Sequence, residues 1–391
     1  MGIFFKTKKE KDRIIAIFDV GSTSVCGSRV LLKWDKEDDI PVVLDSVRLE
    51  MRDIKGGSEK EFEKEAINTL KRTALELFNK KIGKLDEVIC VITTPWCHSE
   101  TKKINFSKKI PFKVTKKILD ELLKKEIDVI SNSLKERYLS EKEIIEKLVT
   151  EVSLDDKPLE NPVGEKCQFL DLSLSYSFAD KDFINKAKEV LTDVFHNSTV
   201  SVSAFSILTY LMIRDNYPGC GSHLILDIAG KTTDLSVVNN GIFAEKFSFP
   251  FGKKTLLKKI ATELKIEERD AYELFKLYYQ KNLTLDHQEK FRKHFESAER
   301  YWSEELKKCL TKIPKYHNLP SVMFLTIDND MRKWFFEVFK KTEFSNNITL
   351  GKKFETIILD TEEMIDKCDL KEGCNDPFIM IEAVALSKKL K

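Results

Sequence analysis

The sequence predicts an α/β protein of at least two domains. The main evidence is a motif that occurs once in each half of the chain, at residues 14–24 and again at 223–234. In both places an apolar strand ends in aspartate and runs into a turn rich in Gly, Ser and Thr. The 391 residues can bury two or more hydrophobic cores. With 42% hydrophobic and 33% charged residues, the composition is that of an ordinary soluble globular protein.

Strands and one long helix are expected in the first part of the chain. The expected strands cover 14–20, 25–32, 42–48 and 87–93, with the charged stretch 35–39 as a hairpin loop. Ser58 precedes a helix, because apolar residues from Phe62 to Phe78 recur at helical spacing. The last of these strands is apolar throughout, which is typical of a strand inside a sheet.

The middle of the chain combines a helix with further strand signals. Thr115 is expected to cap a helix that carries apolar residues from Ile118 to Ile127. Ser140 and Glu143 have the spacing of a capping box, and a loop is equally consistent with them. Residues 168–178 alternate between polar and apolar types, which predicts a half-exposed edge strand.

The last part of the chain repeats the strand-rich pattern around the second motif. Its expected strands cover 223–228, 233–239, 242–249, 321–327 and 356–359. Helices rich in Lys and Glu fill 254–312, an aromatic helix spans 334–339, and a last helix covers 377–390.

Charge and cysteine usage narrow the class of protein. The 66 basic and 64 acidic residues give a net charge of +2, so we expect no nucleic-acid partner. None of the eight cysteines has zinc or redox spacing, which favours free thiols in a reducing cytoplasm. No apolar run is long enough to span a bilayer. Ile3, Phe4 and Phe5 precede four lysines, which suggests a weak contact with an anionic membrane or else a solvated leader.

The first motif has the residue types of a phosphate-binding turn. Gly21 lets the backbone approach a ligand closely. Ser22, Thr23 and Ser24 supply hydroxyl and N–H donors for phosphate oxygens. Asp19, at the end of the strand, can bind Mg²⁺ through water.

The second motif offers the same chemistry. Gly230, Thr232 and Thr233 provide the turn and its hydroxyls, Lys231 can neutralise phosphate charge, and Asp227 is the second magnesium candidate. Two such turns facing each other would clamp a polyphosphate. Each turn alone is also consistent with ordinary turn chemistry and no ligand.

Together the two motifs resemble the phosphate loops of the actin-like ATPases, in particular the branch of the cell-division protein FtsA and the type IV pilus protein PilM. The segments 18–26 and 226–235, followed by Asn240-Gly241, are similar to the two loops. The segments 111–120 and 161–164 are similar to parts of the small inserted domain of this branch. Residues 271–276 are similar to a helix of its upper lobe.

This resemblance implies an actin-like (ribonuclease H-like) fold. Two lobes would each hold a duplicated mixed sheet flanked by helices, with a small α+β domain inserted in the first. The implied first lobe comprises 1–93, 176–220 and 351–391, the inserted domain 94–175, and the second lobe 221–350 with a helical upper subdomain at 254–312.

The resemblance also implies ATP and Mg²⁺ as ligands between the lobes, with Glu273 and Lys276 placed to contact ribose and base. Two departures put the adenosine in doubt. The strand-to-helix turn that carries Gly-Gly in relatives matches residues 326–330, which contain no glycine. A second expected Gly-Gly is Gly252-Lys253 here.

The implied function is a cytoplasmic adaptor, at the inner face of the cell membrane in some states, that docks a peptide of a membrane-anchored pilus or division protein. Self-association into filaments stays open. The chain stops directly after its last expected helix, at residues 387–391, which favours the pilus role. Catalysis would be at most slow ATP hydrolysis, because no hydrolytic motif is evident. The alternatives are a pseudo-ATPase scaffold without nucleotide and a small-molecule kinase of the same fold.

Overall fold

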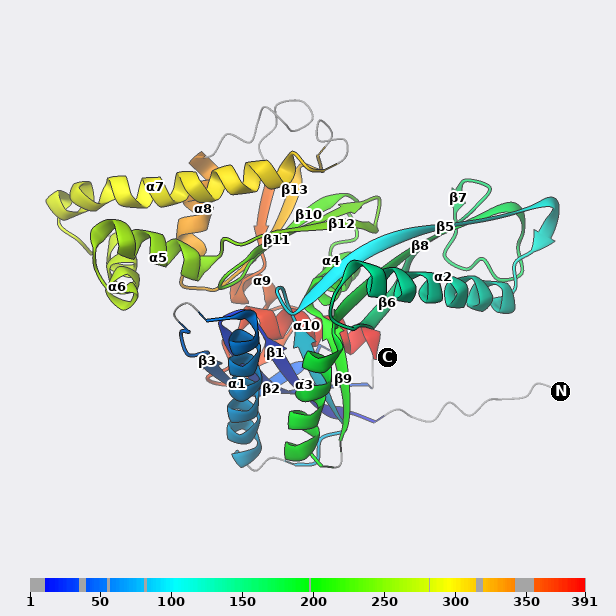
Figure 1. Cartoon of the computed structure of the whole chain (residues 1–391), viewed down its shortest axis with the longest axis horizontal. Coiled ribbons are helices and arrows are strands. Elements are labelled where there is room, and N and C mark those ends of the chain that lie inside the picture. The colour runs from blue at the N-terminus through cyan, green and yellow to red at the C-terminus, as the bar shows by residue number, and fades with distance from the viewer. Residues whose placement is uncertain are drawn as a thin grey trace. The chain divides into compact units, whose positions relative to one another are not determined.

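The computed structural model describes residues 11–34, 40–54, 57–80, 83–196, 198–280, 282–313, 319–341 and 355–390. The expected hairpin loop at 35–39 and the apolar patch at residues 3–5 lie outside the described residues. The chain divides into two compact units. The first unit comprises 1–93, 182–215 and 361–391, and the second unit comprises 94–181 and 216–360 (Figure 1).

The first unit is built on a six-stranded mixed sheet with the strand order β15-β3-β2-β1-β4-β9. Its strands are β1 (Arg13–Val20), β2 (Ser24–Leu32), β3 (Val42–Glu50), β4 (Glu87–Ile92), β9 (Thr199–Ala204) and β15 (Asp369–Leu370). The first three strands are antiparallel neighbours, and β4 and β9 continue the sheet in parallel with β1. This confirms the strands expected in the first part of the chain.

Helices cover both faces of this sheet. They are α1 (Glu59–Asn79), α3 (Lys181–Val194), α4 (Phe205–Asn216), α9 (Thr361–Met364) and α10 (Pro377–Lys389). Ser58 is the N-cap of α1, as the sequence predicts, and its backbone N–H donates to the Glu61 carboxylate at 2.7 Å. Both α1 and α10 contact β1, β2 and β3. A Cβ on Gly27 of β2 would lie 3.0 Å from Thr73 of α1, so α1 packs on this face of β2. Helix α10 packs on the opposite face.

The second unit contains a five-stranded sheet with the order β12-β11-β10-β13-β14. Its strands are β10 (His223–Ile228), β11 (Thr233–Asn239), β12 (Ile242–Phe249), β13 (Val322–Ile327) and β14 (Glu355–Ile358). β13 runs parallel to β10 and to β14. Because β14 completes this sheet, residues 355–360 belong to the second unit, whereas the sequence placed 351–391 in the first lobe.

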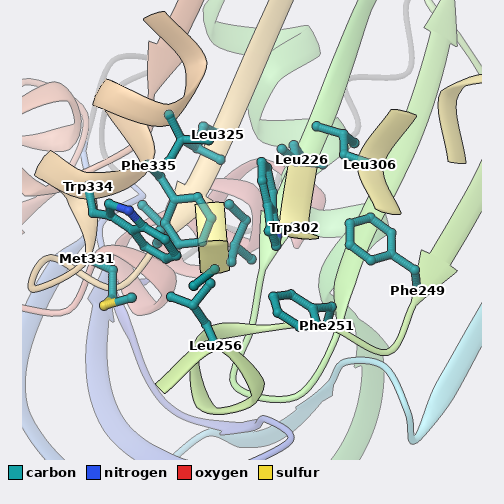
Figure 2. Close-up of a cluster of buried hydrophobic side chains, with 14 of the residues drawn as sticks. Leu226, Phe249, Phe251, Leu256, Trp302, Leu306, Leu325, Met331, Trp334 and Phe335 are labelled. Atoms are coloured by element: carbon teal, nitrogen blue, oxygen red, sulfur yellow. The ribbon is translucent and has the colours of Figure 1, made fainter. Parts of the chain in front are cut away.

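Four helices complete the layer against this sheet. They are α5 (Lys253–Leu264), α6 (Glu268–Tyr279), α7 (Leu285–Leu310) and α8 (Arg332–Lys341). Figure 2 shows the core between them, where Trp302 of α7 and Trp334 of α8 are fully buried beside Leu226 of β10 and Leu325 of β13. Burying aromatic side chains of this size contributes much of the hydrophobic stabilisation of such a core.

The second unit also holds a smaller sheet with the order β5-β8-β6-β7 and one helix against it. The strands are β5 (Cys97–Lys113), β6 (Lys142–Leu154), β7 (Lys157–Pro158) and β8 (Lys166–Asp180), and the helix is α2 (Lys116–Arg137). Thr115 caps α2 by accepting from the Ile118 N–H, as expected. Ser140 lies in the bend before β6 and Glu143 lies in β6, so neither begins a helix and the loop alternative was the better one.

The prediction of an edge strand at 168–178 was wrong. β8 pairs with β5 on one side and with β6 on the other, so it is a central strand of its sheet. The polar and apolar residues alternate because one face of β8 carries small polar side chains, such as Ser175 and Ser177. These side chains are buried, so the alternation does not indicate an exposed face. The strand at the edge beside β8 is β5.

Within the described ranges, we find no helix with the length and apolar composition needed to cross a membrane.

Candidate functional site

The first turn, Gly21–Ser24, is closed by its own backbone between β1 and β2. The Gly21 N–H donates to the Ser24 carbonyl at 3.0 Å, and the Met51 N–H donates to the Thr23 carbonyl at 2.8 Å. A Cβ on Gly21 would lie only 3.2 Å from the Ser24 carbonyl oxygen, so the tight turn favours glycine there. The Ser22 side chain is buried and Thr23 is half-buried.

Asp19, at the end of β1, contacts an arginine that sequence analysis did not single out. Arg48 Nη2 lies 3.4 Å from Asp19 Oδ2, and Nη1 donates to Ser24 Oγ at 2.6 Å. The same guanidinium donates to Asp376 Oδ2 at 2.6 and 2.8 Å. One cation therefore bridges the expected magnesium aspartate and the aspartate that caps α10.

The strand register explains why Arg48 was missed. Asp19 of β1 pairs with Cys26 of β2, and Cys26 pairs with Arg48 of β3. These three residues form one row across the sheet, although Arg48 lies 29 positions from Asp19 in the chain. No local sequence pattern predicts this contact, because it depends on the pairing of β1 with β2 and of β2 with β3.

A buried carboxyl group adds to the acidic character around Asp19. Glu382 of α10 is fully buried, and its two oxygens accept no hydrogen bond from any described residue. Burial raises the pKa of Glu382 well above its ordinary value, and the Asp19 and Asp376 carboxylates raise it further, while Arg48 opposes them. These effects favour the protonated form of Glu382.

The second turn, Ala229–Thr232, is held by the start of α5. The Ala229 N–H donates to the Thr232 carbonyl at 3.0 Å within the turn. The Lys253 N–H donates to the Ala229 carbonyl at 3.0 Å, and the Lys254 N–H donates to the Gly230 carbonyl at 2.7 Å. The first N–H groups of α5, which lack partners inside the helix, thus bind the carbonyl oxygens of the turn.

Gly252, the N-cap of α5, allows this close approach. A Cβ at this position would lie 2.2 Å from the Ala229 carbonyl oxygen and 2.8 Å from two backbone atoms of Gly230. Its φ of −116° is ordinary extended backbone, so the position requires glycine for space and not for conformation.

The side chains of Asp227, Lys231, Thr232 and Thr233 in the second motif differ in burial and in hydrogen bonding. Asp227 Oδ1 accepts from Thr326 Oγ1 at 2.6 Å, on the neighbouring strand β13. Lys231 and Thr232 are half-buried. The Thr233 hydroxyl, which was predicted to serve a phosphate, is buried, donates to the Phe251 carbonyl at 2.7 Å and accepts from Trp302.

The two places where glycines were expected for adenosine are joined by an ion-pair cluster. Lys253 Nζ lies 3.0 Å from Asp328 Oδ2 and 2.7 Å from Asp330 Oδ2. The Tyr272 hydroxyl of α6 donates to the same Asp330 oxygen. We call Lys253, Tyr272, Asp328 and Asp330 the Lys253 cluster.

Burial and the neighbouring carboxylates shift the pKa of Lys253 in opposite directions. Burial lowers the pKa of Lys253, but Asp328 and Asp330 outweigh it, so the net shift is upward and favours the charged amine. Burial and the hydrogen bond to Asp330 raise the pKa of Tyr272 to about 12. Lys253 therefore keeps its positive charge and Tyr272 keeps its proton at neutral pH.

Glu273 and Lys276 lie next to this cluster on α6. Their side chains form an ion pair with each other at 2.8 Å, and Lys276 Nζ also lies 4.7 Å from the centre of the Tyr272 ring. The structure thus brings α6 to the 328–330 turn, while the two charges that were assigned to ribose and base neutralise one another.

A buried ion pair joins strands β11 and β12 of the five-stranded sheet. Lys246 Nζ is 2.7 Å from Asp234 Oδ2, and both side chains are at most 7% exposed. Thr94 and Ser248 donate to the Asp234 carboxylate at 2.7 and 2.6 Å. Asp234 belongs to the second motif, but these contacts make it a structural anchor for Thr94 at the beginning of residues 94–181.

The residues fit the ATP and Mg²⁺ of the resemblance only in part. Both turns keep their close backbone geometry and lie behind a buried aspartate. The adenosine side does not fit, because the 328–330 turn contains no glycine and its charged side chains pair with Lys253. No group of three or more His, Cys, Asp or Glu side chains within the described residues is placed to hold a metal directly.

No family model and no curated protein matches the sequence. Solved structures do have a similar fold. A PilM–PilN type IV pilus biogenesis complex aligns with a TM-score of 0.60 and 12% identity, covering 97% of this chain and 98% of that chain. The ethanolamine utilization protein EutJ from Carboxydothermus hydrogenoformans aligns at 0.45 and 11% identity, covering 97% and 89% of the two chains. The chain therefore has an actin-like ATPase fold.

Proposed function

We propose that this chain is an actin-like adaptor in type IV pilus assembly, with a role in cell division as the related possibility. It docks a peptide of a membrane-anchored partner at the cytoplasmic side of the membrane, and it binds a magnesium-bound phosphate chain such as that of ATP. The observation that carries the proposal is the similarity of fold to PilM, a protein solved in complex with PilN, over almost the whole of both chains. The paired turns with their buried aspartates support the ligand.

Strand β5 offers the most suitable surface for a peptide. It is an edge strand of its sheet, and an extended peptide can extend such an edge by strand addition. Half of its exposed side chains are lysines, at Lys102, Lys103, Lys108, Lys109 and Lys113. Ile110, also in β5, is 77% exposed. We propose that the partner segment is extended and acidic, with an apolar side chain that contacts Ile110.

A peptide array tests this docking surface. The array carries the cytoplasmic segments of pilus and division membrane proteins from the source organism, and affinity is measured by fluorescence anisotropy. An acidic segment should bind the wild type, and the double change Lys108→Glu and Lys109→Glu should weaken it by roughly tenfold or more. Lys258→Glu with Lys307→Glu is the matched control on exposed helix positions. The proposal would be refuted if the double change left the affinity unchanged, or if no segment of the array bound the wild type.

The second candidate is a pseudo-ATPase scaffold that keeps the fold without a nucleotide. Two contacts favour it: Arg48 already pairs with Asp19, and the Lys253 cluster fills the turn after β13. The peptide array does not distinguish the two candidates, whereas a phosphate ligand does.

A further inference from the structure

The ends of two parallel strands define a ligand position in the second unit. β10 and β13 run side by side in the same direction, from the pair Leu224–Met323 to the pair Ile228–Ile327. Their carboxyl ends therefore lie at one edge of the sheet, where open α/β sheets bind their ligands. The Ala229–Thr232 turn follows β10, and the 328–330 turn follows β13.

Lys253 connects the two turns. Its backbone N–H binds the Ala229 carbonyl of the first of them, and its side chain binds Asp328 and Asp330 of the second. Because Gly252 holds the start of α5 against the turn after β10, the Lys253 backbone is fixed beside that turn. The ion pairs with Asp328 and Asp330 hold its ammonium group at the turn after β13.

The same cluster makes a neutral ligand unfavourable there. A nucleoside base and ribose entering beside β13 must displace Lys253 from its two carboxylates or Tyr272 from Asp330. A neutral group cannot replace an ammonium ion between two carboxylates, so at least one charge would lose its partner at a site where the Lys253 side chain is only 22% exposed. A phosphate chain at the Ala229–Thr232 turn does not meet this difficulty, because it carries no base or ribose that must displace these contacts.

We propose that the Lys253 cluster closes the nucleoside side of this site, so that the ligand of the second unit is an inorganic polyphosphate with magnesium rather than a nucleotide. This inference rests on the phosphate-binding part of the proposed function and specifies its ligand class. It makes Lys253, Asp328 and Asp330 residues that determine specificity. The nucleoside of ATP adds no affinity over inorganic triphosphate.

Titration calorimetry of the full chain with magnesium triphosphate and with magnesium ATP tests the inference. The wild type should bind triphosphate at least as tightly as ATP. The triple change Lys253→Ala, Asp328→Ala and Asp330→Ala removes all charges of the cluster together and should increase the affinity for ATP relative to triphosphate by roughly tenfold. Removing the exposed ion pair Glu289–Arg292 of α7 by Glu289→Ala and Arg292→Ala is the control and should leave the ratio unchanged.

Three results would overturn the inference. The first is a wild type that binds ATP at least roughly tenfold tighter than triphosphate. The second is a triple variant that unfolds in urea like the wild type and yet keeps the wild-type ratio. The third is a wild type that binds neither ligand, which would favour the scaffold candidate. Peptide docking at β5 is tested separately by the peptide array.

Discussion

Replacing Gly252 by alanine should disturb the Ala229–Thr232 turn. The new Cβ would lie 2.2 Å from the Ala229 carbonyl oxygen, so the turn and α5 must separate by about 1 Å to reach an ordinary contact. That shift breaks or lengthens the hydrogen bonds from the Lys253 and Lys254 N–H groups, which are 3.0 and 2.7 Å long.

The expected destabilisation follows from these two bonds. Each contributes about 1 kcal/mol net, and a donor left without a partner in a buried place costs about 1–3 kcal/mol. Alanine also has a lower backbone entropy in the unfolded chain, and the extended φ of Gly252 suits it. This effect offsets about 0.4–1 kcal/mol of the destabilisation. We therefore expect Gly252→Ala to lower the free energy of unfolding by roughly 2–3 kcal/mol.

Urea denaturation followed by tryptophan fluorescence measures this change, since Trp302 and Trp334 report on the core of the second unit. Gly219→Ala is the matched control, because a Cβ there meets no atom within 4 Å. It should change the free energy of unfolding by less than about 0.5 kcal/mol. Equal stability of Gly252→Ala and the wild type would refute the steric argument, as would an equal loss in the control.

Two other substitutions probe the buried charges. Lys246→Met should cost about 3–5 kcal/mol in urea unfolding because it leaves Asp234 buried and unpaired, and a second change, Asp234→Leu, should restore part of that loss. Full stability of the single variant would contradict the pairing. Glu382→Gln should stabilise the chain at neutral pH. The folded pKa of Glu382 is raised, so the wild type loses stability as the pH rises from the unfolded pKa toward the folded one, by up to about 1.4 kcal/mol per pH unit. Parallel stability curves for Glu382→Gln and the wild type from pH 5 to 8 would show that Glu382 is not held neutral.

Local signals were sufficient for most helices, strands and caps. Ser58 and Thr115 begin their helices as predicted, because capping depends on residues within one helical turn. The two glycine turns follow β1 and β10 because an apolar run and the glycine after it are adjacent in the chain. Both aspartates lie at the strand ends for the same reason.

Contacts between distant residues could not be predicted in this way. The central position of β8 depends on its pairing with both β5 and β6, and no pattern within β8 encodes its partners. The contact of Arg48 with Asp19 depends on two successive strand registers. Lys253 and Asp328 are 75 residues apart, so two separate departures from the expected glycines give no sign that their side chains meet.

Hydrogen exchange of the full chain, with and without magnesium triphosphate, tests phosphate binding at the Ala229–Thr232 turn most directly. The ligand should slow exchange of the amides at 229–233 relative to magnesium alone, and leave the amides of the smaller sheet over 97–113 unchanged. Unchanged exchange at 229–233 under conditions where calorimetry detects binding would place the phosphate elsewhere and contradict the assignment of this turn.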